Sequence, residues 1–323
     1  MPAFVPMLVG LATVVGGAEL IVRYGSRLAS RLKISPTVVG LTIVSLGTSA
    51  PELAVGINAA LAGRAGIAVG NIVGTNIVNL LLILGVGALI QPIALGSRSL
   101  KLELPAMVIA AVLLFVMSLD GQLSAIEGWF LMVLAAVFTF ALIRASRRAP
   151  LDVQQEYRHE FAPPEEPRSA KATWGYLALT LVGIVVVVIG AELLVRGAVE
   201  LATSYGVTDE VIGLTIVAIG TSAPELVTTI VSSLRGDPRI AIGNLLGSSI
   251  YNIALILGVT MVVSPVAIEV PPVVLRIDMI VMVSTVLACV PAFWTGRRLS
   301  RGEGAAFAVS YLVYMTYLIA VPR

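Results

Sequence analysis

Two glutamates are the residues of this 323-residue chain best placed to do chemistry. Residues 40–53 read GLTIVSLGTSAPEL and residues 213–226 read GLTIVAIGTSAPEL, so that Glu52 and Glu225 end the same polar motif within apolar surroundings. A charged side chain inside a bilayer costs roughly 2.5 to more than 10 kcal/mol, and such residues are typically functional. We therefore predict that both carboxylates belong to a functional site.

Hydroxyl side chains precede each glutamate by four and three residues: Thr48 and Ser49, and Thr221 and Ser222. This spacing brings them close to the carboxylate on a helical surface. The proline directly before each glutamate predicts a helix break with freed carbonyls, which membranes tolerate where the backbone packs in protein or lines a cavity. Such oxygens suit Na⁺ or Ca²⁺. The alternative, a proline kink with hydroxyls bonded to their own backbone, is less favoured because the motif occurs twice.

The next apolar segment of each half adds neutral oxygens. It reads GNIVGTNIVN over 70–79 and GNLLGSSIYN over 243–252. Residues four apart share a helix face, which pairs Thr75 with Asn79 and Ser248 with Asn252. The glycines fit a G-x-x-x-G spacing and are better explained by close helix packing than by ion binding.

Composition places the chain in a membrane. Hydrophobic residues make up 58% and charged residues 12%, and the mean hydropathy is +0.98. One cysteine and one histidine exclude an intrachain disulfide and a site built from several thiolates or imidazoles. Nothing resembles a nucleotide-binding loop or a hydrolase triad, so we expect no enzyme, and an ion gradient is the expected energy source.

Apolar segments predict an all-α, polytopic membrane protein with ten transmembrane helices. The spans fall at about 3–29, 36–61, 66–90, 102–119, 124–143, 173–203, 210–234, 239–263, 272–294 and 304–321. With both termini outside, most of the 21 lysines and arginines lie in cytoplasmic loops. This charge distribution predicts a multi-pass protein of the cell inner membrane or plasma membrane.

Each half contains five spans, an odd number, so the second copy enters the membrane from the opposite side. The predicted units are 1–143, a polar cytoplasmic linker over 144–172, and an inverted half over 173–323. Inverted repeats place equivalent residues near the bilayer midplane, where secondary transporters bind substrate.

The paired GTSAPE segments, each followed by GNxxGxxxxN, resemble the alpha repeats of the sodium/calcium exchanger family, of prokaryotic type, among the cation/Ca²⁺ antiporters. The resemblance covers both halves and is densest over 40–85 and 213–258. It implies four central ion sites and exchange of Na⁺ for Ca²⁺ by alternating access, with these ions as cargo and no cofactor. By motif position, the implied cation ligands are Thr48, Ser49, Glu52, Thr75, Asn79, Thr221, Ser222, Glu225 and Ser248, with the carbonyls of Ser45 and Ala218.

One candidate ligand departs from the family pattern. Asn252 stands where relatives commonly have aspartate, but its amide still presents an oxygen. The two negative charges of the glutamates then balance the charge of one Ca²⁺ or of two Na⁺, and a third Na⁺ would give the site a net positive charge. The proton-coupled branch typically has a glutamate soon after the GN, where this chain has only apolar residues. The coupling ion and stoichiometry stay open.

A second repeated acid has an arginine four residues later: Glu19 precedes Arg23, and Glu192 precedes Arg196. This order favours an ion pair, and we predict structural pairing over a role in the ion path. The resemblance implies that the long spans 1 and 6 form a tilted pair that slides past the other helices.

Two other functions stay open. The chain could exchange another cation pair, H⁺ for Ca²⁺ or a divalent ion of the Mg²⁺ type, or conduct cations passively as a channel. Inverted broken helices favour a carrier. The expected partners are inorganic cations and the lipid bilayer, with neither nucleic acid nor a protein partner implied.

Overall fold

A computed structural model describes residues 4–32, 34, 36–63, 65–96, 99–147, 170–205, 220, 222–236 and 238–320. Most of the predicted linker, the segment 206–219 and Thr221 lie outside these residues. The helices that flank this part of the chain end at Arg147 and begin again at Ala170.

The first half is a series of helices, interrupted by three π-helical turns, η1, η2 and η3. Its elements are α1 (Phe4–Leu32), α2 (Pro36–Val39), η1 (Gly40–Val44), α3 (Ser45–Thr48), α4 (Ala50–Leu61), α5 (Gly66–Ile77), η2 (Val78–Ile83), α6 (Leu84–Ile90), β1 (Ile93–Ala94), η3 (Ser99–Glu103), α7 (Leu104–Met117), the 3₁₀ turn η4 (Ser118–Asp120), β2 (Gln122–Leu123) and α8 (Ala125–Arg147).

The second half repeats this order where it is described. Its elements are α10 (Ala170–Ser204), α13 (Ala223–Leu234), α14 (Pro238–Tyr251), η6 (Asn252–Leu257), α15 (Gly258–Val263), β3 (Ile268–Glu269), η7 (Val274–Asp278), α16 (Met279–Trp294), the 3₁₀ turn η8 (Thr295–Arg297), β4 (Arg298–Leu299) and α17 (Arg301–Ala320).

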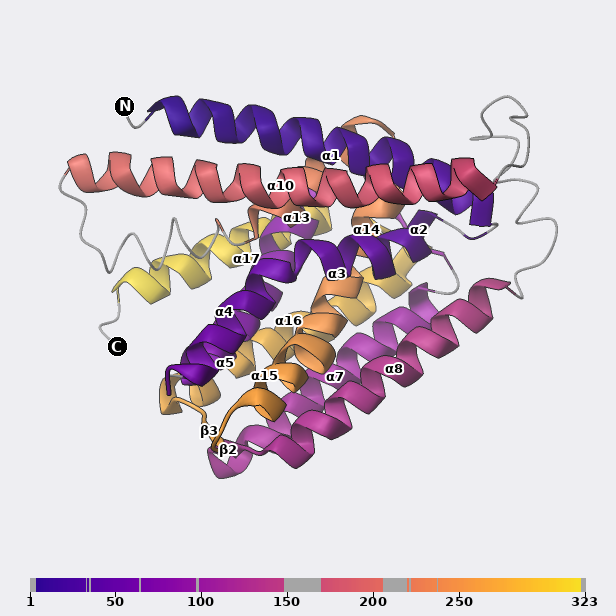
Figure 1. Cartoon of the computed structure of the whole chain (residues 1–323). Helices are drawn as coiled ribbons and strands as arrows, with labels where there is room; N and C mark the ends of the chain where they lie inside the picture. Colours follow the sequence, from indigo (N-terminus) through magenta and orange to yellow (C-terminus); the bar gives the residue numbers. More distant parts are fainter. Residues whose placement is uncertain are drawn as a thin grey trace.

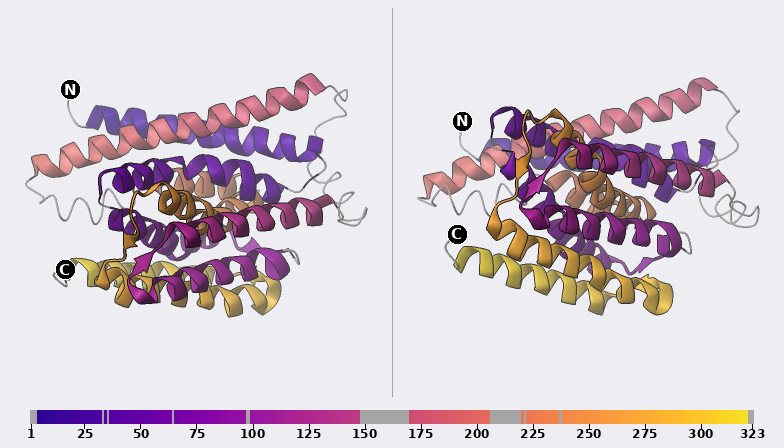
Figure 2. Two further views of the ribbon diagram at one scale, coloured as in Figure 1. Left: turned by 60° about the horizontal axis from the view of Figure 1, so that its bottom comes forward. Right: turned by 90° about the horizontal axis from the view of Figure 1, so that it is seen from below.

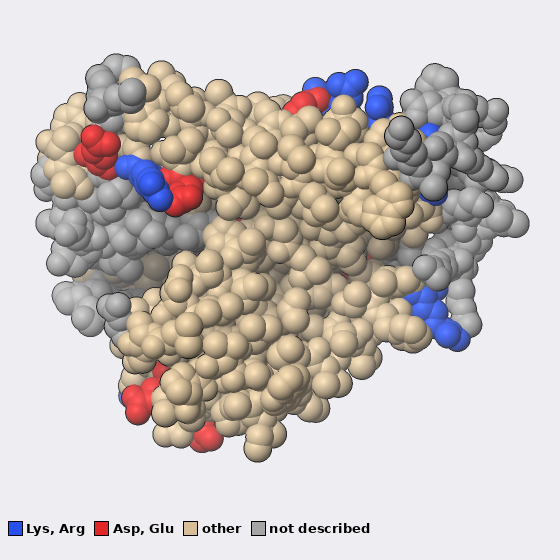
Figure 3. All heavy atoms as spheres, viewed as in Figure 1, with Lys and Arg blue, Asp and Glu red and all other residues tan. Residues whose placement is uncertain are grey.

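Among the described residues, seven helices are long and apolar enough to cross a membrane, and the bent pair over 37–48 and 50–61 forms an eighth candidate span. Part of the span predicted at 210–234 lies outside the described residues. The span predicted at 304–321 corresponds to α17, a 20-residue helix that is not among those seven. On the face shown in Figure 3, charged side chains lie near the edges and a broad uncharged surface separates them, as lipid contact requires.

Two short antiparallel ladders connect the halves. Ile93 of β1 pairs with Leu299 of β4, and Leu123 of β2 pairs with Ile268 of β3. In the repeat, β1 of the first half is equivalent to β3 of the second half, and β2 is equivalent to β4. The ladder of β1 with β4 is therefore the symmetry counterpart of the ladder of β2 with β3. All four named residues are buried, which fixes the connections between spans against the core.

Helices α1 and α10 lie side by side and run in opposite directions across one side of the bundle (Figures 1 and 2). Their 29 and 35 residues confirm that spans 1 and 6 are long. Glycines allow the contact, since a Cβ at Gly10 would come within 2.5 Å of the Leu194 nitrogen, and one at Gly17 within 2.7 Å of a Val187 methyl. The equivalent glycines, Gly183 and Gly190, form the other side of this contact.

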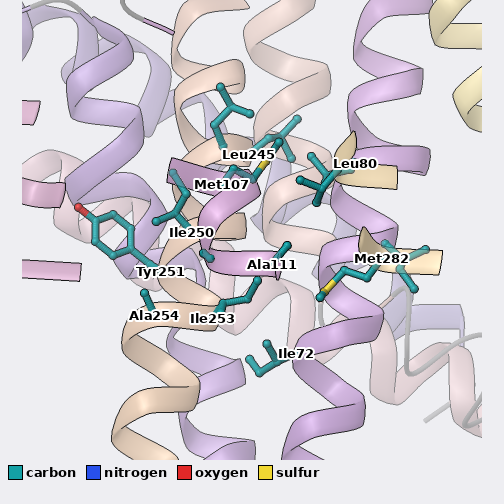
Figure 4. Packing of buried hydrophobic residues seen from close by; sticks show 14 of the residues in the cluster. Ile72, Leu80, Met107, Ala111, Leu245, Ile250, Tyr251, Ile253, Ala254 and Met282 are labelled. Carbon is teal, nitrogen blue, oxygen red and sulfur yellow. The ribbon is translucent and has the colours of Figure 1, made fainter. Parts of the chain in front are cut away.

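The main apolar core contains side chains from both halves (Figure 4). Leu80 of η2 and Leu245 of α14 are fully buried there, together with Met107 of α7 and Met282 of α16. The spans over 66–90 and 238–263 are the most buried of the candidate spans. These two spans therefore form the centre of the protein and can carry polar residues away from lipid.

Candidate ion-binding site

Both predicted helix breaks are present. The first lies at Ser49 (φ −83°, ψ 9°), where the axis bends by 42°. The second lies at Ser222 (φ −89°, ψ 8°), directly before α13. The following proline sits in the first helical turn, where its missing N–H costs nothing. Each half-helix thus starts with Glu52 or Glu225 in its first turn, where the helix dipole favours a negative charge.

The two glutamate side chains are completely buried and lie near enough for their charges to repel each other. None of the four carboxylate oxygens has a hydrogen-bond partner among the described residues. Burying a carboxylate costs several kcal/mol unless an opposite charge compensates it. Within the described chain, no group of three His, Cys, Asp or Glu forms a metal cluster. The pair of glutamates is therefore the centre of negative charge in this site.

Hydroxyl groups of α3 and of Ser49 at the break meet the facing helix α14. Ser45 Oγ lies 3.2 Å from Ser248 Oγ, and Ser49 Oγ donates to the same Ser248 oxygen at 3.5 Å. Thr48 Oγ1 and Ser248 Oγ also lie close to the Glu225 carboxylate without forming a regular hydrogen bond. The break of the first half and the helix of the second half thus contribute to one site, as an inverted repeat predicts.

Asn244 is a site residue that the sequence analysis did not single out. Its Oδ1 accepts a hydrogen bond from Thr48 Oγ1 at 3.2 Å, and its carbonyl accepts one from Ser45 Oγ at 3.3 Å. The available signal was its position as the second residue of the repeated GN motif. Without the helix register, however, the motif could not show that this amide faces the broken span.

The Ser45 carbonyl, an implied ligand, accepts hydrogen bonds within its own helix in this conformation. That carbonyl accepts the Ser49 N–H at 3.0 Å and lies 3.4 Å from Thr48 Oγ1. The backbone therefore stays helical up to the break. The equivalent carbonyl of Ala218, and the side chain of Thr221, lie outside the described residues.

The two candidate asparagines occupy equivalent π-helical turns. Asn79 lies in η2 and Asn252 begins η6. Both are fully buried, and neither amide has a hydrogen-bond partner among the described residues. Thr75, one turn before Asn79, is also buried. Single π-helical turns frequently mark functional sites, and here they place two amides in the protein interior.

Glycines of α14 bring these polar groups together, as predicted. A Cβ at Gly243 would collide with the Thr37 carbonyl, and one at Gly247 would lie 2.6 Å from Ser45 Oγ. The close approach lets Asn244 and Ser248 contact α3. Residues 213–219, which are equivalent to 40–46 in the repeat, lie outside the described residues.

The repeated Glu–Arg pairs behave differently from each other. Glu192 pairs with Arg196 as predicted, but the predicted pair of Glu19 with Arg23 is wrong. Glu19 pairs with Arg235 at the end of α13, because α1 packs against that helix. The Arg23 guanidinium lies 5.8 Å from the centre of the Tyr24 ring. The pair therefore joins two helices instead of stabilising one.

Two inverted sets of membrane helices around a buried, oxygen-rich, doubly acidic site define a secondary cation antiporter. Comparison with known proteins identifies the family, since the family model described as sodium/calcium exchanger protein matches residues 2–144 and 175–320. The chain belongs to this family.

Relatives are similar along almost the whole chain. The putative antiporter CaxA of Alkalimonas amylolytica is 35% identical, over 97% of this chain and 98% of the relative. Inner membrane protein YrbG of Escherichia coli is 33% identical, over 97% and 95%. The sodium/calcium exchanger MaX1 of Methanosarcina acetivorans is 31% identical, over 98% and 99%.

A solved structure of the sodium-calcium exchanger NCX_Mj, soaked with Na⁺ and Sr²⁺, superposes with a TM-score of 0.83. It is 28% identical, and the match covers 100% of this chain and 99% of that one. Together with the helices described above, this similarity confirms the predicted fold class, an all-α membrane protein with ten helices in two inverted five-helix repeats.

Proposed function

We propose that this protein exchanges Na⁺ for Ca²⁺ across the membrane by alternating access at a site centred on Glu52 and Glu225. The observation that carries the proposal is the pair of fully buried glutamates, whose four carboxylate oxygens have no hydrogen-bond partner among the described residues. A cation between them would compensate a burial that is otherwise strongly unfavourable. The family membership and the relatives named as exchangers support this choice of ions.

The proposed ligands surround this pair and come from both halves. Hydroxyl, amide and carbonyl oxygens add no charge, so they can complete the coordination of a hard cation. The full proposed set is Thr48, Ser49, Glu52, Thr75, Asn79, Thr221, Ser222, Glu225, Ser248 and Asn252, with the carbonyls of Ser45 and Ala218. Binding at Ser45 would replace the hydrogen bonds that its carbonyl accepts.

Competition for the two glutamates couples the ions. One Ca²⁺ or two Na⁺ neutralise the charge of the site. The protein can then reorient between its outward-facing and inward-facing states at a low cost in free energy. An empty site keeps two buried negative charges, which opposes reorientation. Ion-free return is therefore slow, and each direction of movement requires bound cations.

The two halves, 1–143 and 173–323, would form the moving parts, joined by the linker 144–172. We place both termini outside the cell inner membrane or plasma membrane, because this orientation puts most lysines and arginines in cytoplasmic loops. The cations are cargo, and the proposal requires neither a cofactor nor a protein partner.

The test is ⁴⁵Ca²⁺ uptake into proteoliposomes loaded with Na⁺, with K⁺ or Li⁺ replacing Na⁺ as controls. We expect uptake that requires internal Na⁺, saturates with Ca²⁺ and disappears in Glu52→Gln. Flux without any counter-ion would indicate a channel. Uptake driven only by an imposed pH gradient would identify H⁺ as the coupling ion, and competition by Mg²⁺ would test the choice of divalent ion.

A further inference from the structure

The buried face of α13 is polar beyond the ion site. Four hydroxyl residues, Thr228, Thr229, Ser232 and Ser233, follow Glu225 at helical spacings that keep them on its face, and all four are buried. The opposite face is apolar and ends in the exposed Leu234. We call these four residues the hydroxyl row. It extends about 12 Å from Glu225 at 1.5 Å per residue, close to half of the roughly 30 Å hydrocarbon core.

The hydroxyl row does not follow the pattern of other threonines in the chain. Thr42, Thr180 and Thr260 each donate to the carbonyl four residues earlier, at 2.7–2.8 Å. In contrast, the hydroxyls of Thr228 and Thr229, and that of Ser233, have no hydrogen-bond partner among the described residues. A buried hydroxyl without a partner destabilises the folded state. The row therefore requires an explanation other than helix stability.

Packing does not supply this explanation, because the first half builds the same helix without hydroxyls. At the offset of 173 residues, the positions equivalent to the row are Val55, Gly56, Ala59 and Ala60 of α4. The glutamate is repeated and the break is repeated, whereas the row is confined to the second half. Neither the fold nor the site geometry requires it.

We propose that the hydroxyl row lines the path by which partly dehydrated Na⁺ and Ca²⁺ pass between Glu225 and the Arg235 end of α13. This inference rests on the proposed function and adds a route to the same site. The hydroxyl oxygens replace part of the hydration shell of a cation on its way through the membrane, as oxygens that line channels do. The distribution of lysine and arginine predicts that the Arg235 end is cytoplasmic.

The path is closed in this conformation. Helix α6 packs against the row, since a Cβ at Gly87 would lie 2.8 Å from a Thr229 methyl and 3.9 Å from Ser233 Oγ. At its outer end, Arg235 forms the ion pair with Glu19 of α1. Movement of α1 relative to α13 would break this ion pair and open the outer end of the row, so its accessibility should depend on the bound ion.

The first experiment measures access. In a Cys289→Ala background, single cysteines replace Thr229 or Ser233, and a charged, membrane-impermeant methanethiosulfonate is added to either side of oriented vesicles. We expect reaction from the Arg235 side only, at rates that differ between Na⁺, Ca²⁺ and ion-free conditions. Ala60→Cys on α4 and Ile230→Cys, at a half-buried position on the apolar face of α13, are the matched controls, and both should stay unreactive from that side. Failure of both row cysteines to react from that side in all three conditions would overturn the proposal.

The second experiment separates the path from the site. Combining Thr229→Val, Ser232→Ala and Ser233→Ala should lower the rate of exchange about tenfold, the effect of losing roughly one hydrogen bond's free energy along the route. Equilibrium Ca²⁺ affinity should stay within about twofold, because the site ligands are intact. Thr260→Val removes a buried hydroxyl outside the row and should leave the rate unchanged.

A triple variant that transports at the wild-type rate would refute the path. A wild-type protein without Na⁺-dependent Ca²⁺ uptake would instead refute the proposed function, so the two failures are distinguishable.

Discussion

The substitution Glu225→Gln tests the charge balance of the site directly. It keeps the shape of the side chain and removes one of the two buried negative charges. A bound Ca²⁺ would then leave one uncompensated positive charge. Removing one partner of a buried ion pair costs about 3–5 kcal/mol. At 1.4 kcal/mol per factor of ten, Ca²⁺ affinity should fall roughly a hundredfold to several thousandfold.

Stability without ions should change in the opposite direction. The wild-type protein buries two repelling carboxylates, so the variant removes an unfavourable charge and should melt at a higher temperature in a chelator. Ca²⁺ should raise the melting temperature of the wild type through preferential binding to the folded state, and it should not do so for the variant.

Thermal unfolding in detergent with and without Ca²⁺ measures both effects, alongside ⁴⁵Ca²⁺ uptake. Glu192→Gln is the matched control, because that side chain is 59% exposed and its pair with Arg196 contributes little. A Glu225→Gln protein that still gains stability from Ca²⁺, or that melts at a lower temperature without ions, would refute the reasoning.

Three further predictions concern helix contacts. Gly247→Ala would place a Cβ 2.6 Å from Ser45 Oγ and should destabilise the fold by about 1–3 kcal/mol. The control Gly16→Ala meets no described atom within 4 Å and should be neutral or slightly stabilising. Equal losses of stability in thermal unfolding would contradict this prediction. Glu19→Arg and Arg235→Glu should each alter the exchange rate, and the double variant should restore it, because the ion pair joins α1 to α13; an additive double variant would argue against the pairing. Spin-label distances between ion conditions should change more for α1 and α10 than for α5 and α14, and equal changes would rule out sliding of the pair.

The sequence was sufficient for features that depend on local pattern. The proline motifs predicted the breaks at Ser49 and Ser222, since proline lacks an N–H and clashes with the preceding helical turn. Span positions followed from the length of apolar segments, and α10 and α17 match their predicted ranges to within a few residues. The offset of 173 residues predicted the paired halves, which the two exchanged strand ladders then connect.

Features that depend on contacts between distant elements could not be predicted. Thr48 reaches Asn244 across 196 positions, and this depends on how closely the glycines of α14 approach the broken span. Glu19 has an arginine at the favourable spacing in its own helix, yet it pairs with Arg235 because α1 crosses the end of α13. Local spacing shows which partner is possible, and tertiary packing decides which partner is used.

The two halves have similar shapes at one contact but different chemistry. Thr229 contacts Gly87, and Thr260 contacts Gly56. At the offset of 173 residues Thr229 is equivalent to Gly56 and Thr260 to Gly87, so each contact contains one threonine and one glycine. Thr260 donates its hydroxyl to Ile256, whereas the Thr229 hydroxyl has no partner among the described residues. Equal shape lets the halves exchange conformations, as alternating access requires. Unequal polarity means that the routes on the two sides of the site offer a cation different numbers of oxygens, so release should be faster along α13 than along α4.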